Sequence, residues 1–221
     1  LVLYPMEGQN RRLERNKGVL QVLEQRFAIR STIDLSPLEQ QNIFLEGTGS
    51  RVLDRQHRIS YACHSGRTHQ DALRQFAERL DYQLCVFHAV DRHHAPIYHS
   101  NVMMSVGRDL SVVCLQALPD ASERQALERS LRDTGKDILA LDFDQLEAFA
   151  GNMLEVHDRD GQPLLVMSAS AWSALHPAQR THVERHTRPV VVNIDNIERI
   201  GGGSARCMLA EVHLPARASF Q

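Results

Sequence analysis

The sequence predicts an α/β fold in which mixed units of strands and helices are arranged around an axis, as the blades of a propeller are. The first observation is a repeat, because β-rich segments begin at Ile43, Ile97, Gly151 and Ala205, each 54 residues after the previous one. The second observation is that the units share the order strand, strand, helix, strand. Mixed repeats of this length are typical of radial repetition. The competing prediction is a doubly wound parallel sheet, for which we would expect a βαβαβ run without paired front strands.

The first complete unit is predicted over residues 51–88. Its expected elements are strands at 51–53 and 59–63, a helix at 69–80 and a strand at 82–88. The helix is predicted because Ala72, Phe76 and Leu80 fall on one of its faces. Thr68 is the expected N-cap, since a threonine oxygen can accept a hydrogen bond from the first turn.

Two further units repeat this order. The second unit is expected to have strands at 110–118 and 137–142 with a helix between them that ends at 131. The third is expected to have strands at 153–157 and 163–168, a helix at 178–184 and a strand at 190–194. Ser122 and Gln125 have the spacing of a capping box, which predicts where the first of these helices begins. The run from Asp158 to Gly161 has the composition of a hairpin turn.

Half units are predicted at both ends of the chain. A helix at 11–26 and a strand at 28–34 would form the back half of one unit, and residues 205–214 the front half of another. We expect residues 1–221 to form a single domain. Because the chain starts with Leu1 rather than Met, inside a stretch patterned as mid-strand, we also expect it to lack an N-terminal part of the protein.

Composition limits the classes of partner. The 221 residues are 43% hydrophobic, enough for a large core, and the net charge is −2 with 25 basic and 27 acidic residues. Without a basic stripe, nucleic acid is not an expected partner. No apolar run approaches the ~20 residues that span a bilayer, so no membrane segment or signal peptide is expected. The four cysteines are widely spaced without a CxxC pair, which favours a reducing cytoplasm.

Cys207 is the first candidate for chemistry. It follows three glycines, Gly201 to Gly203, and stands next to Arg206. Glycine lets the backbone approach a ligand closely, and a neighbouring cation favours the thiolate, which is the nucleophilic form of cysteine. The alternative is a small buried side chain, as is expected for Cys85 and Cys114 within apolar strands.

His99 and Glu46 occupy nearly equivalent places in their units, 53 residues apart, and Cys207 follows His99 by 108 residues. Equivalent places in radial units point toward one axis, so the three side chains are expected to converge. A histidine there can exchange protons near neutral pH. A partly buried carboxylate needs a cation, and a planar guanidinium binds it through two parallel hydrogen bonds. The alternatives are a core histidine and a solvated turn glutamate.

A metal site is the weaker interpretation of the histidines. His88, His93, His94 and His99 are clustered in the sequence, but they lack the HExxH spacing, and Asp91 and Arg92 indicate a solvated turn. We therefore expect neither a metal nor a cofactor.

Four motifs together resemble those of the citrulline-utilisation hydrolases, members of the guanidine-modifying superfamily of arginine deiminases, dimethylarginine hydrolases and amidinotransferases. The motifs are Phe44 to Ser50, Ser65 to His69, Tyr98 to Met104, and Gly201 to Met208. The resemblance runs from residue 1 to about residue 215 and implies a pentein-like, pseudo-fivefold α/β propeller of ββαβ units with its site on the axis.

The resemblance also implies roles for single residues. Cys207 would be the nucleophile, His99 the general acid and base, Glu46 a carboxylate that binds the guanidinium, and Arg67 an arginine that grips a substrate carboxylate. Asn101 departs from the family pattern, since several deiminases have aspartate there. An amide can hydrogen-bond a cation but cannot neutralise it, which permits a less basic ureido substrate. The resemblance also implies a further acidic residue, which relatives carry on a segment that would precede Leu1.

These expectations predict a cysteine-dependent hydrolase of a guanidino or ureido amino acid that resembles arginine or citrulline. The expected partner is that small molecule, and a homo-oligomer is allowed. One alternative is an amidinotransferase, in which an amine replaces the water that releases the product. Another is a binding module that holds a guanidino or amino-acid ligand without chemistry.

Overall fold

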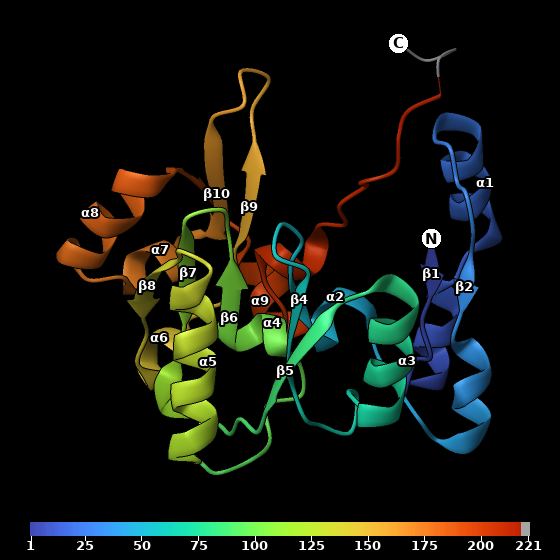
Figure 1. The fold of residues 1–221 in the computed structure, drawn as a ribbon. Coiled ribbons are helices and arrows are strands. Elements are labelled where there is room, and N and C mark those ends of the chain that lie inside the picture. The colour runs from blue at the N-terminus through green and yellow to red at the C-terminus, as the bar shows by residue number, and fades with distance from the viewer. Residues whose placement is uncertain (218–221) are drawn as a thin grey trace.

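Three repeats of one strand-strand-helix-strand unit dominate the fold (Figure 1). The structure is a computed structural model and describes residues 1–217. In each unit the first two strands form an antiparallel hairpin, and a helical crossover returns the chain to a third strand that is parallel to the second. The α/β class and the predicted ββαβ unit are therefore confirmed.

The elements of the three units follow one another along the chain. The first unit contains β3 (Val52–Asp54), β4 (Ile59–Cys63), α3 (Gln70–Leu80) and β5 (Gln83–Phe87). The second contains β6 (Met104–Val106), β7 (Leu110–Val113), η3 (Leu115–Ala117), α5 (Ala121–Asp133) and β8 (Asp137–Ala140). The helix α6 (Phe143–Glu147) leads to the third, which contains β9 (Leu154–His157), β10 (Pro163–Ser168), α7 (Ala169–Ala174), α8 (Pro177–His186) and β11 (Arg188–Val192), followed by α9 (Asp195–Gly201).

The N-terminal residues form an incomplete unit. It contains β1 (Val2–Leu3), η1 (Gln9–Glu14), α1 (Lys17–Arg26), β2 (Ile33–Asp34) and η2 (Ser36–Gln41), and β1 pairs with β2 in parallel. The predicted helix at 11–26 is divided, because Asn16 leaves helical geometry and caps α1 by accepting a hydrogen bond from the Gly18 N–H. The predicted strand at 28–34 is reduced to two residues.

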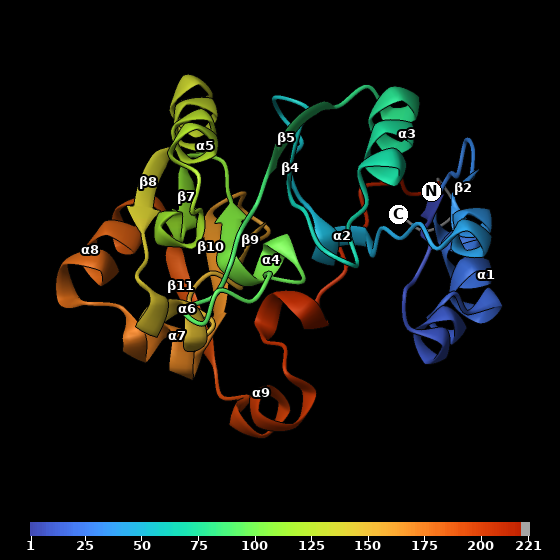
Figure 2. The same cartoon turned by 90° about the horizontal axis from the view of Figure 1, so that it is seen from below.

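The units lie side by side around a common centre (Figure 2). The first strand of each unit contacts the first strand of the next, β3 with β6 and β6 with β9. The crossover helices fill the spaces between units, since α5 contacts β5 and β8, and α8 contacts β8 and β11. This arrangement is consistent with the predicted propeller and brings the beginnings of the units together at the centre.

A short helix at the beginning of a unit is a feature that the sequence did not predict. The three short helices are α2 (Gly47–Ser50), α4 (Ser100–Met103) and η4 (Ala205–Met208). Their N-cap residues are Glu46, His99 and Ser204. Glu46 and His99 are therefore equivalent, as predicted, whereas the equivalent of His99 in the last unit is Ser204 and Cys207 lies one helical turn further on.

Three predicted details are wrong. Residues 205–214 do not form strands: Ala205–Met208 form η4, and most of the residues that follow are exposed. Thr68 does not cap α3, whose N-cap is His69, because Thr68 is held in bridges to Leu45 and Ser65. The cap of α5 is Asp120, whose carboxylate accepts hydrogen bonds from the N–H groups of Ser122 and Glu123.

The core consists of two apolar clusters. The larger one extends through all three complete units, and the smaller one packs α3 against the N-terminal residues. Burying this apolar surface supplies the main driving force for folding. Between the first two units, Lys136 Nζ lies 3.0 Å from Asp54 Oδ2, with both side chains almost fully buried. Within residues 1–217, no helix combines the length and apolarity that crossing a membrane requires.

Candidate active site

A cavity of about 930 Å³ lies at the centre of the ring of units. All the residues predicted for the site line it, namely Glu46, Arg67, His99, Asn101 and Cys207. The short helices explain this convergence, because α2 contacts α4 and places Glu46 next to His99. Residues from three separate units thus face one space, as the repeat predicts.

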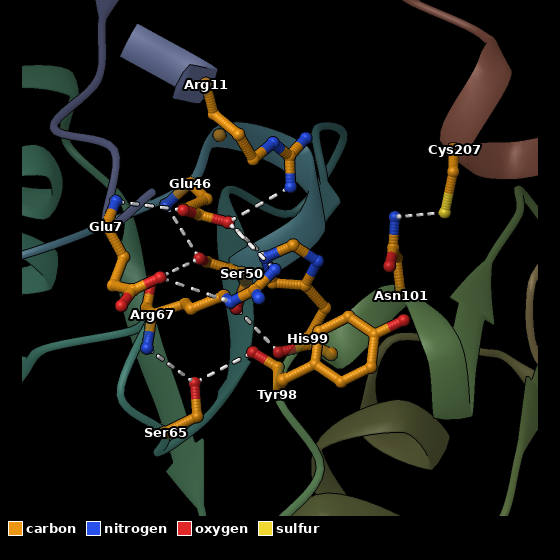
Figure 3. Close-up of polar contacts among 12 residues, drawn as sticks. Glu7, Arg11, Glu46, Ser50, Ser65, Arg67, Tyr98, His99, Asn101 and Cys207 are labelled. Atoms are coloured by element: carbon orange, nitrogen blue, oxygen red, sulfur yellow. Dashed lines mark hydrogen bonds and ion pairs between the residues drawn. The ribbon is translucent and has the colours of Figure 1, made fainter. Parts of the chain in front are cut away.

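Glu46 and His99 form a buried pair on one side of the cavity (Figure 3). His99 Nε2 lies 2.9 Å from Glu46 Oε2, and the side chains are 8% and 1% exposed. The ring packs against Gly49, where a Cβ would come within 2.7 Å of His99 Nδ1. Any other residue at position 49 would push the imidazole away, which explains why the motif needs glycine there.

Glu46 is held in its ionised form by its surroundings. Burial acts to raise the pKa of the carboxyl group, but hydrogen bonds from His99 and from the Glu7 N–H, together with the charges of His99 and Arg11, hold that pKa below its ordinary value. The Glu7 N–H lies 2.9 Å from Oε1. With an ionised carboxylate as acceptor, His99 must carry the proton on Nε2 and donate it.

Two arginines approach the same carboxylate from the cavity. Arg11 Nη1 lies 3.5 Å and Arg67 Nη1 3.7 Å from Glu46 Oε2. Arg67 also lies over the ring of Tyr98, with its guanidinium carbon 5.2 Å from the ring centre. Among the described residues, the Arg67 guanidinium makes ion pairs at 3.7 and 3.9 Å but no hydrogen bond. Its donors are therefore available to another acceptor.

Cys207 approaches the cavity from the opposite side (Figure 3). Asn152 Nδ2 lies 3.3 Å and Asn101 Nδ2 3.8 Å from Cys207 Sγ. Cys207 Sγ can also donate to Asn152 Oδ1 at 3.6 Å, so the sulfur is held between two amide side chains. At Gly203, a Cβ would lie 3.3 Å from Cys207 Sγ. A side chain at position 203 would therefore crowd the sulfur, and the backbone comes this close because the residue is glycine.

Arg206 supports the fold around Cys207. Its Nη1 donates a hydrogen bond to the Leu209 carbonyl at 2.8 Å, and its Nη2 lies 3.1 Å from Glu211 Oε2. Burial lowers the pKa of its guanidinium, although the Glu211 charge opposes this. The groups within hydrogen-bond reach of the sulfur are therefore the amides of Asn101 and Asn152 rather than the predicted cation.

The other three cysteines differ from Cys207 in exposure. Cys207 is exposed, whereas Cys63 and Cys114 are buried and Cys85 is half-buried. Burial raises the pKa of Cys63 to about 11 and that of Cys85 to about 11. It also raises the pKa of Cys114. The predicted contrast between one accessible thiol and inert core cysteines is present.

Three residues of the site were not assigned by the sequence. Arg11 gave no signal, since nothing in the pattern of η1 shows that its arginine faces the cavity. Tyr98 begins one of the four motifs but was given no role of its own. Asn152 follows Gly151, where a repeat begins, and an asparagine at such a place is expected to satisfy backbone groups. It does this, through a hydrogen bond of 2.7 Å from Nδ2 to the Asn101 carbonyl, but the same amide also reaches Cys207.

The four histidines of the alternative metal site do not come together as a ligand set within residues 1–217. His99 pairs with Glu46, while His88 Nδ1 lies 2.9 Å from Glu123 Oε1 and its ring stacks on His64.

Comparison with known proteins identifies a family whose model matches almost the whole chain. The family model for N,N-dimethylarginine dimethylhydrolase, eukaryotic, matches residues 1–214. A search of curated proteins finds no significant match.

Solved structures share the fold. The cyanobacterial arginine dihydrolase ArgZ superposes with a TM-score of 0.73 at 18% identity, over 97% of this chain and 31% of that chain. The amidinotransferase SxtG from Microseira wollei superposes with a TM-score of 0.63 at 14% identity, over 100% of this chain and 65% of that chain. An adduct of dimethylarginine dimethylaminohydrolase superposes with a TM-score of 0.57 at 14% identity, over 94% of this chain and 71% of that chain. The chain therefore spans about a third of full-length ArgZ and 71% of its N-terminal domain.

Proposed function

Because the chain belongs to the eukaryotic N,N-dimethylarginine dimethylhydrolase family, we propose that it hydrolyses a C–N bond in a guanidino or ureido amino acid through a covalent intermediate on Cys207. The observation that carries this proposal is the shared cavity, which an accessible thiol enters from one side and a buried carboxylate–imidazole pair from the other. A nucleophile and an acid–base group facing one space are the minimum that covalent catalysis requires.

Substrate binding begins with the planar head group. Asn101 Oδ1 is buried and has no hydrogen-bond partner among the described residues. An unsatisfied buried oxygen is costly, so an N–H group of the substrate would stabilise it. Glu46 would hold the other side of the head group, beside the hydrogen bond that it accepts from His99.

The two arginines at the cavity suit the carboxylate of an amino-acid substrate. Guanidinium donors match a carboxylate in a bidentate geometry, and the donors of Arg67 have no hydrogen-bonded partner among residues 1–217. Arg11 reaches the same region from η1. We assign Arg67 to the substrate carboxylate, with Arg11 as its neighbour, so that the distance from Arg67 to Cys207 sets the length of the substrate.

The reaction would then proceed in two steps. The Cys207 thiolate, stabilised by the amides of Asn101 and Asn152, attacks the central carbon of the head group, and His99 donates a proton to the departing nitrogen. The resulting intermediate is bound to sulfur. His99 next removes a proton from water, the hydroxide attacks the same carbon, and the C–S bond breaks to release the product and the thiolate. Glu46 orients the imidazole and stabilises its protonated form.

A product screen tests the proposal. Full-length protein is incubated with arginine, citrulline, methylated arginines and agmatine, and the products are identified by mass spectrometry. We expect release of ammonia, or of an alkylamine from methylated substrates, with no turnover by a Cys207→Ser variant. Turnover by that variant would contradict a covalent step on Cys207. Incubation with arginine and glycine gives guanidinoacetate only if the protein transfers the amidino group instead.

A further inference from the structure

A second cluster of ionisable side chains lies on the outer edge of the molecule. It consists of Asp137 at the start of β8 and of His182 and His186 on α8, and the nearest ligand atoms of all three lie within 4.8 Å of one another. None of these residues lines the central cavity. In both views of the fold, α8 and β8 lie together at the edge, away from α2 and α4 (Figures 1 and 2).

The three side chains converge on one oxygen atom. His182 Nε2 lies 2.7 Å and His186 Nε2 3.2 Å from Asp137 Oδ2. The other oxygen, Oδ1, accepts a hydrogen bond from the Ile138 N–H at 3.0 Å, which fixes the orientation of the carboxylate.

The backbone holds these ligands in place. His182 and His186 are four residues apart on one helix, which puts both rings on the same face one turn apart. The helix α8 contacts β8, and β8 is hydrogen-bonded to β7. The side chains of the two histidines are 25% and 23% exposed, and that of Asp137 is 51% exposed. The cluster is therefore anchored on regular structure and still open to solvent.

The geometry points to a binding site for a divalent transition metal ion such as Zn²⁺, formed by Asp137, His182 and His186, which would link the helix of the third unit to the last strand of the second. Two imidazoles and one carboxylate are ligands that suit zinc and its neighbours rather than Mg²⁺ or Ca²⁺, which prefer oxygen. In a tetrahedral site with bonds of about 2.0–2.1 Å, ligand atoms lie roughly 3.3 Å apart. The observed separations therefore need only small side-chain movements, and water completes the coordination.

Binding would displace the Nε2 protons of both histidines, because the Nε2 atoms face Asp137 and a ring nitrogen coordinates a metal only without its proton. The ion replaces two hydrogen bonds to one carboxylate oxygen with three coordinate bonds. Since a metal that binds only the native state stabilises it, the linkage between units should raise the melting temperature. This inference does not depend on the proposed enzymatic function.

Thermal unfolding tests the site. The measurement uses Cys207→Ser protein, to remove the exposed thiol as a competing ligand, with ZnCl₂ or MgCl₂. At a Zn²⁺ concentration about a hundred times Kd we expect the melting temperature to rise by roughly 5–10 °C, and Mg²⁺ should leave it unchanged. The His182→Gln/His186→Gln variant should lose the shift. A matched control, His157→Gln, removes an exposed histidine next to Glu155 in β9 and should keep it. An equal shift in the double variant, or none in the parent, overturns the site.

The absorption spectrum of bound Co²⁺ gives an independent readout that does not depend on the stability of the double variant. On the same Cys207→Ser protein we expect d–d bands of a nitrogen- and oxygen-ligated ion without a sulfur-to-cobalt charge-transfer band. Such a charge-transfer band would place the ion on a cysteine and contradict the proposed ligands.

Discussion

His99 Nε2 donates a hydrogen bond of 2.9 Å to Glu46 Oε2, although the two residues are 53 positions apart in the chain. Each is the N-cap of a four-residue helix at the beginning of its unit. The repeat therefore builds the pair, because equivalent positions of neighbouring units point to the same centre. The consequence is an imidazole whose orientation is fixed by a buried carboxylate before any substrate arrives.

Replacing Glu46 with Gln should lower kcat about 100-fold or more, because the imidazole loses the charge that stabilises its protonated form, and acid–base catalysis contributes about 10²–10⁴-fold. The measurement is steady-state kinetics on the substrate found in the product screen. Glu39→Gln is the matched control, since Glu39 is a carboxylate paired with an arginine, Arg15, but does not itself line the cavity. Equal losses in the two variants would show that Glu46 acts only through stability.

Iodoacetamide should label Cys207 first among the four cysteines. It is exposed and has amide donors, whereas burial raises the pKa of Cys63 and that of Cys85 to about 11 and also raises that of Cys114. Peptide mapping after brief exposure near pH 7.5 measures the order, and a bound substrate should slow the reaction. Equal labelling of Cys85 would contradict the special reactivity of Cys207 and favour a binding module.

Arg67→Ala should raise KM for an amino-acid substrate about 10–100-fold with little change in kcat, because hydrogen bonds to charged groups contribute about 1.5–3 kcal/mol. Agmatine provides an internal control, since it has the guanidino group of arginine without the carboxylate. Its kinetics should be nearly unchanged in the variant. A similar loss for both compounds would assign Arg67 to the head group instead.

The sequence allowed the repeat, the boundaries of β4 and β10, and the convergence of Glu46, His99 and Cys207 to be predicted, because regular spacing of apolar segments reflects equivalent positions in space. Arg67 and Asn101 were expected only from the resemblance of their motifs to a known family, and both line the cavity. The short helices were missed, since the four residues of α2 or α4 contain less than two turns of periodicity. The donors around Cys207 were also missed. A side chain such as Asn152 reaches the sulfur through tertiary packing, which local pattern does not encode.

Asn152→Asp tests the amide environment of the sulfur. A carboxylate next to Cys207 disfavours the thiolate through like-charge repulsion, so the pH at which alkylation reaches half its maximal rate should rise by about one unit or more. Asn152→Ala is the uncharged control and should move that pH less. The readout is the rate of iodoacetamide labelling of Cys207 between pH 6 and 10. An unchanged profile in the aspartate variant would exclude Asn152 as a partner of the thiolate.

The stability of the protein in acid should depend on Glu46. The pKa of this carboxyl group is held below its ordinary value of 4.5 in the folded state. The unfolded chain therefore binds a proton more readily than the native state does, and the ionised carboxylate stabilises the fold above about pH 4.5. This contribution is lost as the pH falls through the lower pKa of the folded state.

Urea unfolding between pH 7 and pH 3 measures this dependence in wild-type protein and in Glu46→Gln. The other carboxylates with lowered pKa values, Glu39, Asp54, Asp91 and Asp137, remain in both proteins, so the difference between the two proteins isolates Glu46. We expect the free energy of unfolding of the wild type to fall more steeply below pH 4.5 than that of the variant. A difference that stays constant over the whole range would mean that Glu46 gains no net stabilisation from His99, Glu7 and Arg11, and that the pair with His99 does not hold the carboxylate in its charged form.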